Sequence, residues 1–246
     1  MEISELLFEL SHPARLEILR LITETPMRLT KIADRVSANN PEVSRHLDRL
    51  RAAGLVEREP EGTYFVSPLG LYILSSLPGL DFLARNSDYF RYHDLSLLPD
   101  PFVGRLGELN ACERAEGTYV GIEKGIEIYG QSEKWFSTLA PEYLPDSVEV
   151  VPDVREKLSQ GVTFRTIVGP TFRLPPSLEP TPENRFRVVP KLPLGLGVSE
   201  KEAMLVFPDL MGRMDLTVAF SSDDERFLRW CEDLVEWLWS RGEGLK

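Results

Sequence analysis

The chain has 246 residues, with 28 Lys and Arg against 39 Asp and Glu, so its formal net charge is −11. This length suits one or two domains with a sizeable core, and 42% hydrophobic with 27% charged residues excludes a disordered chain. The acidic balance excludes binding to nucleic acid through bulk positive charge. It leaves open a local basic surface, because the field near a contact is set by nearby charges.

The sequence lacks the features that membrane insertion, export and metal binding require. No run of about 18 apolar residues is present, so no membrane span is expected. The first helix is acidic where a signal peptide is basic, so we expect a cytoplasmic protein. Cys112 and Cys231 lie far apart and are interpreted as buried thiols. His12, His46 and His93 are too scattered to predict a metal site, and no cofactor is predicted.

Residues 1–76 are predicted to form three to four helices and a β-hairpin. Apolar residues recur at helical spacing in three segments: Leu6, Leu7 and Leu10; Leu16, Leu19 and Ile22; Leu29, Ile32, Ala33 and Val36. After Gly54, two strand-like runs flank Pro60-Glu61-Gly62, which is typical of a hairpin turn.

The clearest helix start is Asn39-Asn40-Pro41-Glu42. Asn is a good N-cap, Pro suits the first helical position, and Glu suits the positive end of the helix dipole. Val43, Leu47 and Leu50 then follow at helical spacing, and Gly54 is the expected stop.

This helix is predicted to turn polar side chains outward. Because Val43, Leu47 and Leu50 face inward, the outer face holds Glu42, Ser44, Arg45, Asp48 and Arg49. An exposed helix held by a companion helix is the geometry that enters a major groove. Arg45 suits a guanine or a phosphate, and Ser44 and the amides of Asn39 and Asn40 suit bases or phosphates.

The local charge agrees with this interpretation. Residues 28–58 contain seven basic and four acidic side chains, a balance of +3, which leaves −14 for the rest of the chain. We therefore predict that Arg45→Ala and Arg49→Ala each weaken DNA binding by about 1–3 kcal/mol. The alternative is a solvated helical face with no partner.

Residues 4–67, which include LSHPARLEILRLI and VSRHLDRLRAAGLV, resemble the winged helix-turn-helix of ArsR-type transcription regulators. The resemblance implies a recognition helix over 40–53 and a wing around 57–65. It implies base contacts from Glu42, Ser44, Arg45 and Arg49, and DNA-backbone contacts from the wing residues Arg58, Glu61, Gly62 and Thr63. The CxC motif of the metal-sensing members is absent from residues 30–37, so metal sensing by that route is not expected.

The fold class expected for the chain is α+β: the winged helix-turn-helix over 1–76, a linker helix over 77–101 and a mixed α/β regulatory domain over 102–246. The linker is rich in large aromatic residues: Phe82, Tyr89, Phe90 and Tyr92. It is therefore predicted to form the contact between the two chains of a homodimer. Strands are expected at 117–122, 162–169, 185–189, 203–207 and 215–221, and helices near 123–138, 152–160 and 222–240. Seven prolines between 170 and 193 predict a surface loop.

Two segments of the second domain, 88–113 and 191–239, resemble the archaeal methanogenesis regulators of the FilR type. More distantly, this domain resembles half of a phospholipase D fold. That enzyme fold needs the motif HxKxxxxD, and none of the three histidines has a lysine two residues later. Any such fold here is therefore expected to bind rather than to catalyse.

Basic residues also gather in the second domain. Residues 165–191 contain Arg165, Arg173, Arg185, Arg187 and Lys191 against Glu179 and Glu183. Arg165 and Arg187 lie on strand-like runs and are candidates for binding an anionic small-molecule effector, and His93 is a further candidate. The alternatives are surface arginines paired with acids elsewhere and a histidine with a structural role at a helix end.

Together these features predict a sequence-specific transcription regulator that binds double-stranded DNA as a homodimer. Its second domain would sense an effector or mediate assembly. One alternative is a protein-interaction module of the transcription machinery. Another is a nucleic-acid-processing enzyme, which is disfavoured because no nucleophile elbow or phosphate loop is present. A steep dependence of DNA affinity on salt would favour the regulator.

Overall fold

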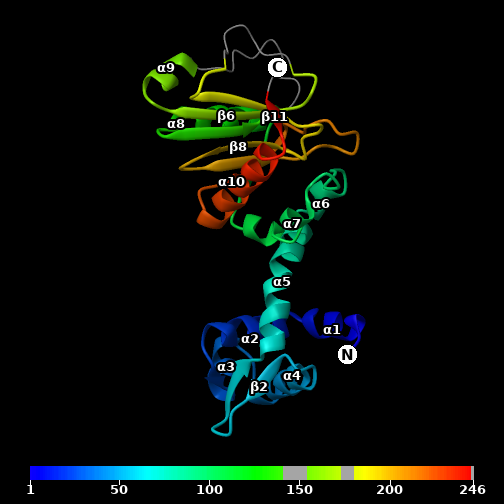
Figure 1. Ribbon diagram of the computed structural model, residues 1–246. Helices are drawn as coiled ribbons and strands as arrows, with labels where there is room; N and C mark the ends of the chain where they lie inside the picture. The colour runs from blue at the N-terminus through cyan, green and yellow to red at the C-terminus, as the bar shows by residue number, and fades with distance from the viewer. Residues whose placement is uncertain (141–153, 173–179, 245–246) are drawn as a thin grey trace. The chain divides into compact units, whose positions relative to one another are not determined.

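The computed structural model describes residues 1–140, 154–172 and 180–244, and the chain divides into two compact units, 1–77 and 78–246. Figure 1 labels their helices and strands. The first unit contains α1 (Ile3–Leu10), α2 (Pro13–Glu24), β1 (Met27–Arg28), α3 (Leu29–Arg35), α4 (Asn40–Ala52), β2 (Val56–Arg58), β3 (Thr63–Val66) and the start of α5 (Pro68–Arg85).

The first unit is a helical cluster with a small antiparallel sheet. The sheet has the order β1-β3-β2, and β2 and β3 form the predicted hairpin. Its core takes one stripe from each helix, with Ile18, Ile32 and Leu47 fully buried. The predicted helical periodicity is confirmed for the residues that reach this core, whereas Leu7, expected on the stripe of the first helix, is 52% exposed.

The second unit is built on one eight-stranded mixed sheet. Its elements are α6 (Ser87–Phe90), α7 (Asp100–Val103), η1 (Leu106–Leu109), β4 (Glu113–Glu116), α8 (Val120–Gln131), β5 (Trp135–Leu139), α9 (Val154–Ser159), β6 (Thr163–Val168), β7 (Asn184–Val188), β8 (Gly195–Ser199), β9 (Ala203–Val206), β10 (Val218–Ser222), α10 (Glu225–Trp239) and β11 (Glu243–Gly244). The strand order is β11-β7-β6-β5-β8-β9-β10-β4, in which β5, β6 and β7 are parallel.

Helices cover both faces of this sheet. Alternate residues of a strand point to opposite faces: Met204 of β9 packs in a cluster with Ile128 and Tyr129 of α8, whereas Leu205 packs with residues of α10. All five residues of β8 and of β10 are buried. Strands covered on both sides exclude charged side chains, and β8 and β10 contain only apolar residues, glycine and serine.

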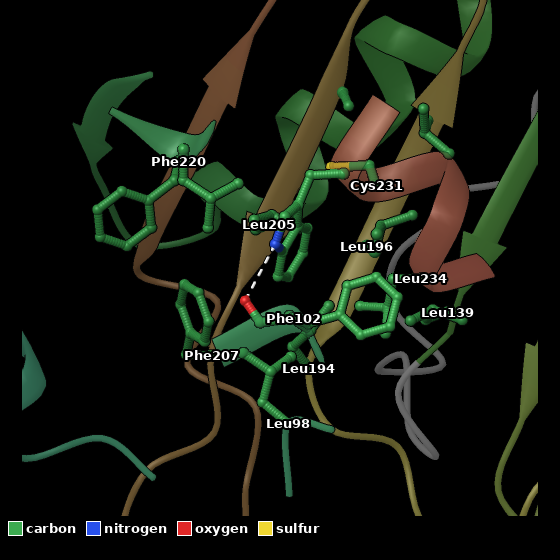
Figure 2. Close-up of a cluster of buried hydrophobic side chains, with 14 of the residues drawn as sticks. Leu98, Phe102, Leu139, Leu194, Leu196, Leu205, Phe207, Phe220, Cys231 and Leu234 are labelled. Carbon is green, nitrogen blue, oxygen red and sulfur yellow. Dashed lines mark hydrogen bonds between the residues drawn. The ribbon is translucent and has the colours of Figure 1, made fainter. Parts of the chain in front are cut away.

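α10 is the main covering helix of one face. Asp224 caps it by accepting from the backbone N–H of Arg226 and Phe227. Its apolar stripe lies in the core shown in Figure 2, where the indole of Trp230 donates to the carbonyl of Phe102 over 3.3 Å. Cys231 is buried there, Cys112 is half-buried, and both thiols are free, as expected.

The segment 117–122 was expected to be a strand, and this is wrong, because α8 begins at Val120. Gly121 explains the difference. A Cβ at this position would lie 2.8 Å from Cγ1 of Val206, so only glycine lets the helix backbone lie this close to the sheet. In this unit β4, β8 and β11 were not predicted, and β5 takes up residues that were expected in the helix near 123–138.

The interpretation of 77–101 as a linker helix that dimerises through its aromatic residues also needs correction. α5 ends at Arg85, and residues from Pro78 onward belong to the second unit. Phe82 and Tyr89 are buried in that unit, where both rings contact Phe220. Of the four aromatic residues, only Tyr92 is exposed. The others are occupied by the core of their own chain and cannot form a dimer surface.

Across the described residues, none of the helices combines the length and the apolar character needed to cross a bilayer.

Candidate nucleic-acid interface

α3, a short turn and α4 form the predicted helix-turn-helix. In the turn, Ser37 adopts a left-handed backbone with φ 51°, which reverses the chain between the helices. Asn39 then caps α4, because its Oδ1 accepts from the backbone N–H of Glu42 over 2.9 Å. Since this oxygen is used by the cap, only the Asn39 amide nitrogen is left for a base or phosphate. Asn40, on the first turn of α4, is exposed.

The outer face of α4 is led by Arg45. Val43, Leu47 and Leu50 are fully buried, as predicted, and Glu42 and Ser44 are half-buried. Arg45 is exposed, and within the described part of the chain no carboxylate lies within ion-pairing distance of it. Its guanidinium is therefore available for a bidentate contact.

Arg49 was also expected to contact bases, but its side chain binds Glu9 of α1. Its Nε donates to Glu9 Oε2 over 3.0 Å, and Nη2 donates to Glu9 Oε1. The guanidinium also lies 5.2 Å from the centre of the Phe8 ring. The hydrogen bond from Arg49 lowers the pKa of Glu9. A paired arginine cannot make a bidentate base contact without breaking the pair, so the prediction of a base contact from Arg49 is corrected to a structural role.

The wing is a tight hairpin. Gly62 has φ 91°, a backbone conformation that suits glycine at a turn, and its N–H donates to the carbonyl of Glu59. The side chain of Arg58 lies over the ring of Tyr64 at 5.4 Å. Thr63 is half-buried next to the exposed Glu61. Arg58 is thus an exposed cation at the wing, although its acidic neighbours weaken its attraction to phosphate.

Sequence reasoning missed a histidine pair behind the recognition helix. The rings of His12 and His46 lie 4.5 Å apart, and His46 is buried with no hydrogen-bond partner for either ring nitrogen among the described residues. Burial lowers the pKa of His46, His12 and Arg15 add to this, and Glu42 opposes it. The helical spacing of Val43, Leu47 and Leu50 could have revealed that position 46 also faces inward.

His93 was predicted to bind an effector, and its surroundings are those of a structural residue instead. Its Nδ1 lies 2.7 Å from the carbonyl of Tyr89 and its Nε2 lies 2.9 Å from Asp215 Oδ2. Its ring stacks on Tyr89 at 3.5 Å. Both nitrogens are used within the protein, so the assignment of His93 to an effector site is withdrawn.

Arg165 and Arg187 lie on neighbouring strands and share a face with Arg185. Arg165 forms an ion pair with Glu236, whereas Arg187 has no carboxylate partner within the described ranges. Arg173 and Glu179, which also belonged to the predicted basic segment, lie outside the described residues. Across the whole described part of the chain, no group of three or more His, Cys, Asp and Glu side chains could hold a metal ion.

Comparisons with known proteins agree with the helix-turn-helix. A helix-turn-helix domain family matches residues 10–59, which hold α2 to β2. The chain matches no curated protein.

Similar solved structures share the fold only loosely. TrmBL2, described as an archaeal chromatin protein with a novel mode of DNA binding, is 12% identical, with 95% of this chain and 94% of that chain covered and a TM-score of 0.44. NucT from Helicobacter pylori is 8% identical, with 55% and 99% covered and a TM-score of 0.41. A transcriptional regulator from Alicyclobacillus acidocaldarius is 12% identical, with 91% and 93% covered and a TM-score of 0.29. At these scores none of them supports a function for this chain.

Proposed function

We propose that this protein is a sequence-specific DNA-binding transcription regulator that reads the major groove with α4. The observation that carries the proposal is Arg45, an exposed guanidinium without a carboxylate partner in the described structure, on the outer face of the second helix of a helix-turn-helix. Ser44 and Asn40 lie beside it on the first turns of the same helix. Bidentate contact of arginine with guanine is the commonest specific contact in such a groove.

Other exposed cations of the first unit also support DNA binding by the helix pair α3 and α4. Three exposed side chains flank or belong to α3 and have no carboxylate partner among the described residues: Arg28, Lys31 and Arg35. They suit the DNA backbone, which positions a protein without reading its sequence. Arg58 and Thr63 of the wing would add backbone contacts. Arg51, by contrast, pairs with Asp48 at 3.8 Å.

A homodimer belongs to this proposal, because helix-turn-helix regulators read two-fold symmetric sites. In place of the aromatic residues now found in the core, α5 offers an exposed stripe. Leu69 and Tyr72, both in the part of α5 that belongs to the first unit, are 48% and 76% exposed and lie on one side of the helix, three residues apart. The second unit would be the regulatory one, and its resemblance to FilR-type regulators stays a prediction.

The test is selection of bound sequences from a random DNA pool, followed by affinity measurements on the selected site. We expect Arg45→Ala to weaken binding by about 1–3 kcal/mol and to relax the preference at one base position. Arg20→Ala removes the same charge from the exposed side of α2 and is the matched control, for which we expect a much smaller change.

Two outcomes would contradict the proposal. One is a folded Arg45→Ala variant with the affinity and sequence preference of the wild-type protein. The other is a wild-type protein that selects no sequence and whose affinity for DNA does not fall with salt. The second result would favour the alternative of a protein-interaction module.

A further inference from the structure

Three arginines of the second unit converge on a single tryptophan. Arg165 on β6 lies directly opposite Arg185 on the parallel strand β7, and Arg187 follows Arg185 by two residues, so all three side chains leave the same face of the sheet. Trp239 ends α10, which packs against β5, β6 and β8. The centre of its ring lies 5.6, 5.7 and 5.5 Å from the guanidinium carbons of Arg165, Arg185 and Arg187.

This arrangement is costly for folding alone, because like charges directly opposite each other on neighbouring strands repel. The unit has no shortage of acids that could pair with them, since residues 78–246 contain 28 Asp and Glu against 19 Lys and Arg. Elsewhere in the unit Arg105, Arg114 and Arg229 each have a carboxylate partner. Within the cluster, and counting partners among the described residues, only Arg165 has one, Glu236.

The other two arginines keep most of their hydrogen-bonding capacity. Arg187 donates to the carbonyl of Gly242 over 3.4 Å, and among the described residues no side chain pairs with the exposed Arg185. Contact with the tryptophan ring orients a guanidinium without using its N–H donors. Glu243 does not reach this face, because it pairs with Val188, which points to the other side of the sheet.

The charges at this end of α10 sum to +2. With the three arginines we count Arg241, which stacks on Trp237 at 3.9 Å, and against them Glu236 and Glu232. A phosphate monoester carries a charge of about −1.5 to −2 at pH 7 and has three strong acceptor oxygens. Arginine forks match these oxygens in bidentate geometry.

We propose that Arg165, Arg185, Arg187 and Trp239 form a binding site for a phosphate monoester, and that this ligand is the signal of the regulatory unit. The site deepens the proposed function by naming the ligand class, but the binding itself does not depend on DNA. A test without DNA therefore separates the failure of this inference from the failure of the DNA-binding proposal.

The experiment is a titration of the full chain with phenyl phosphate, inorganic phosphate and benzoate at constant ionic strength, followed by calorimetry and tryptophan fluorescence. We expect saturable binding of phenyl phosphate and a change in fluorescence that the Trp239→Phe variant loses. In the double variant Arg185→Gln, Arg187→Gln we expect at least tenfold weaker binding. Arg226→Gln, which removes an exposed arginine from the first turn of α10, is the control and should bind as the wild type does.

The titration with inorganic phosphate shows whether the site recognises the phosphate group alone or an organic phosphate monoester. Binding as tight as that of phenyl phosphate supports a site for the phosphate alone, and weaker binding supports an organic monoester. Three results would overturn the inference: no saturable binding at millimolar concentration, benzoate bound as tightly as phenyl phosphate, or unchanged binding by the double variant with a wild-type circular dichroism spectrum.

Discussion

Arg15 and Arg49 reach the C-terminal end of α1 from two other helices. Buried Arg15 donates to the carbonyls of Glu9 and Phe8 over 2.5 and 2.6 Å, and these are among the last carbonyls of α1, which have no partner within the helix. Arg49 binds the Glu9 carboxylate from α4. α4 is therefore held against α1 by Arg49, the side chain that the helical spacing suggested for DNA.

Glu9 is accordingly expected to stabilise the first unit in a pH-dependent way. Its pKa in the folded protein is lower than the ordinary value of 4.5, first because of the hydrogen bond from Arg49. The unfolded chain then binds the proton more readily, so the ionised carboxylate stabilises the fold above pH 4.5 and loses this effect as the pH falls below it. Glu9→Gln should lower the unfolding free energy at pH 7, and the difference from the wild type should shrink in acid.

Urea unfolding followed by far-ultraviolet circular dichroism measures this difference. Tryptophan fluorescence would not report on it, because all four tryptophans lie in the second unit. Glu5→Gln is the control, since Glu5 is an exposed acid of the same helix. If the difference in unfolding free energy between the wild type and Glu9→Gln stays unchanged down to pH 3, the effect of Glu9 is not electrostatic.

At the scale of elements, α4 and α10 were predicted correctly because the signals that define their ends are local. An Asn or Asp cap acts on N–H groups two or three residues away, so a single sequence contains all that is needed. α8 was mistaken in part for a strand because its packing partner is distant. Glycine at 121 is disfavoured in an isolated helix, and only the contact with Val206 explains its presence.

Two glycines of α8 test this explanation in one helix. Gly121→Ala places a Cβ 2.8 Å from Val206 and 3.3 Å from the carbonyl of Leu216, so we expect it to destabilise the second unit by about 1–3 kcal/mol. Gly125→Ala meets no atom within 4 Å and should stabilise the helix by up to about 1 kcal/mol. Urea unfolding followed by tryptophan fluorescence measures both, and equal effects would refute the close approach.

At the scale of the whole molecule, the net charge of −11 conceals an uneven distribution. Residues 28–58 carry +3, but Arg49 and Arg51 are paired with acids. Within residues 28–58, the cations without carboxylate partners in the described structure therefore lie on and around α3, on the outer face of α4 and on the wing. The acidic remainder would repel phosphate and orient the protein on DNA through this surface.

The exposed stripe of α5 is the basis for a prediction about assembly. A charge placed in an apolar interface must lose its hydration, so Leu69→Lys with Tyr72→Lys should raise the dimer dissociation constant at least tenfold in sedimentation velocity. Leu71 is an exposed residue of the same helix on another side, two residues from Leu69, so Leu71→Lys is the control. If the double variant dimerises as tightly as the wild type, the dimer surface lies elsewhere.

The sequence by itself determined the helix-turn-helix, its hairpin and the capped C-terminal helix, because periodicity, caps and turns act over a few residues. It also determined that Arg45 lies on an outer face. Only the tertiary structure decided that Arg49 belongs to Glu9, that the aromatic residues of 77–101 enter a core, and that three arginines meet at Trp239. These are contacts between residues 40 to more than 100 positions apart, and no local pattern specifies which distant partner a side chain finds.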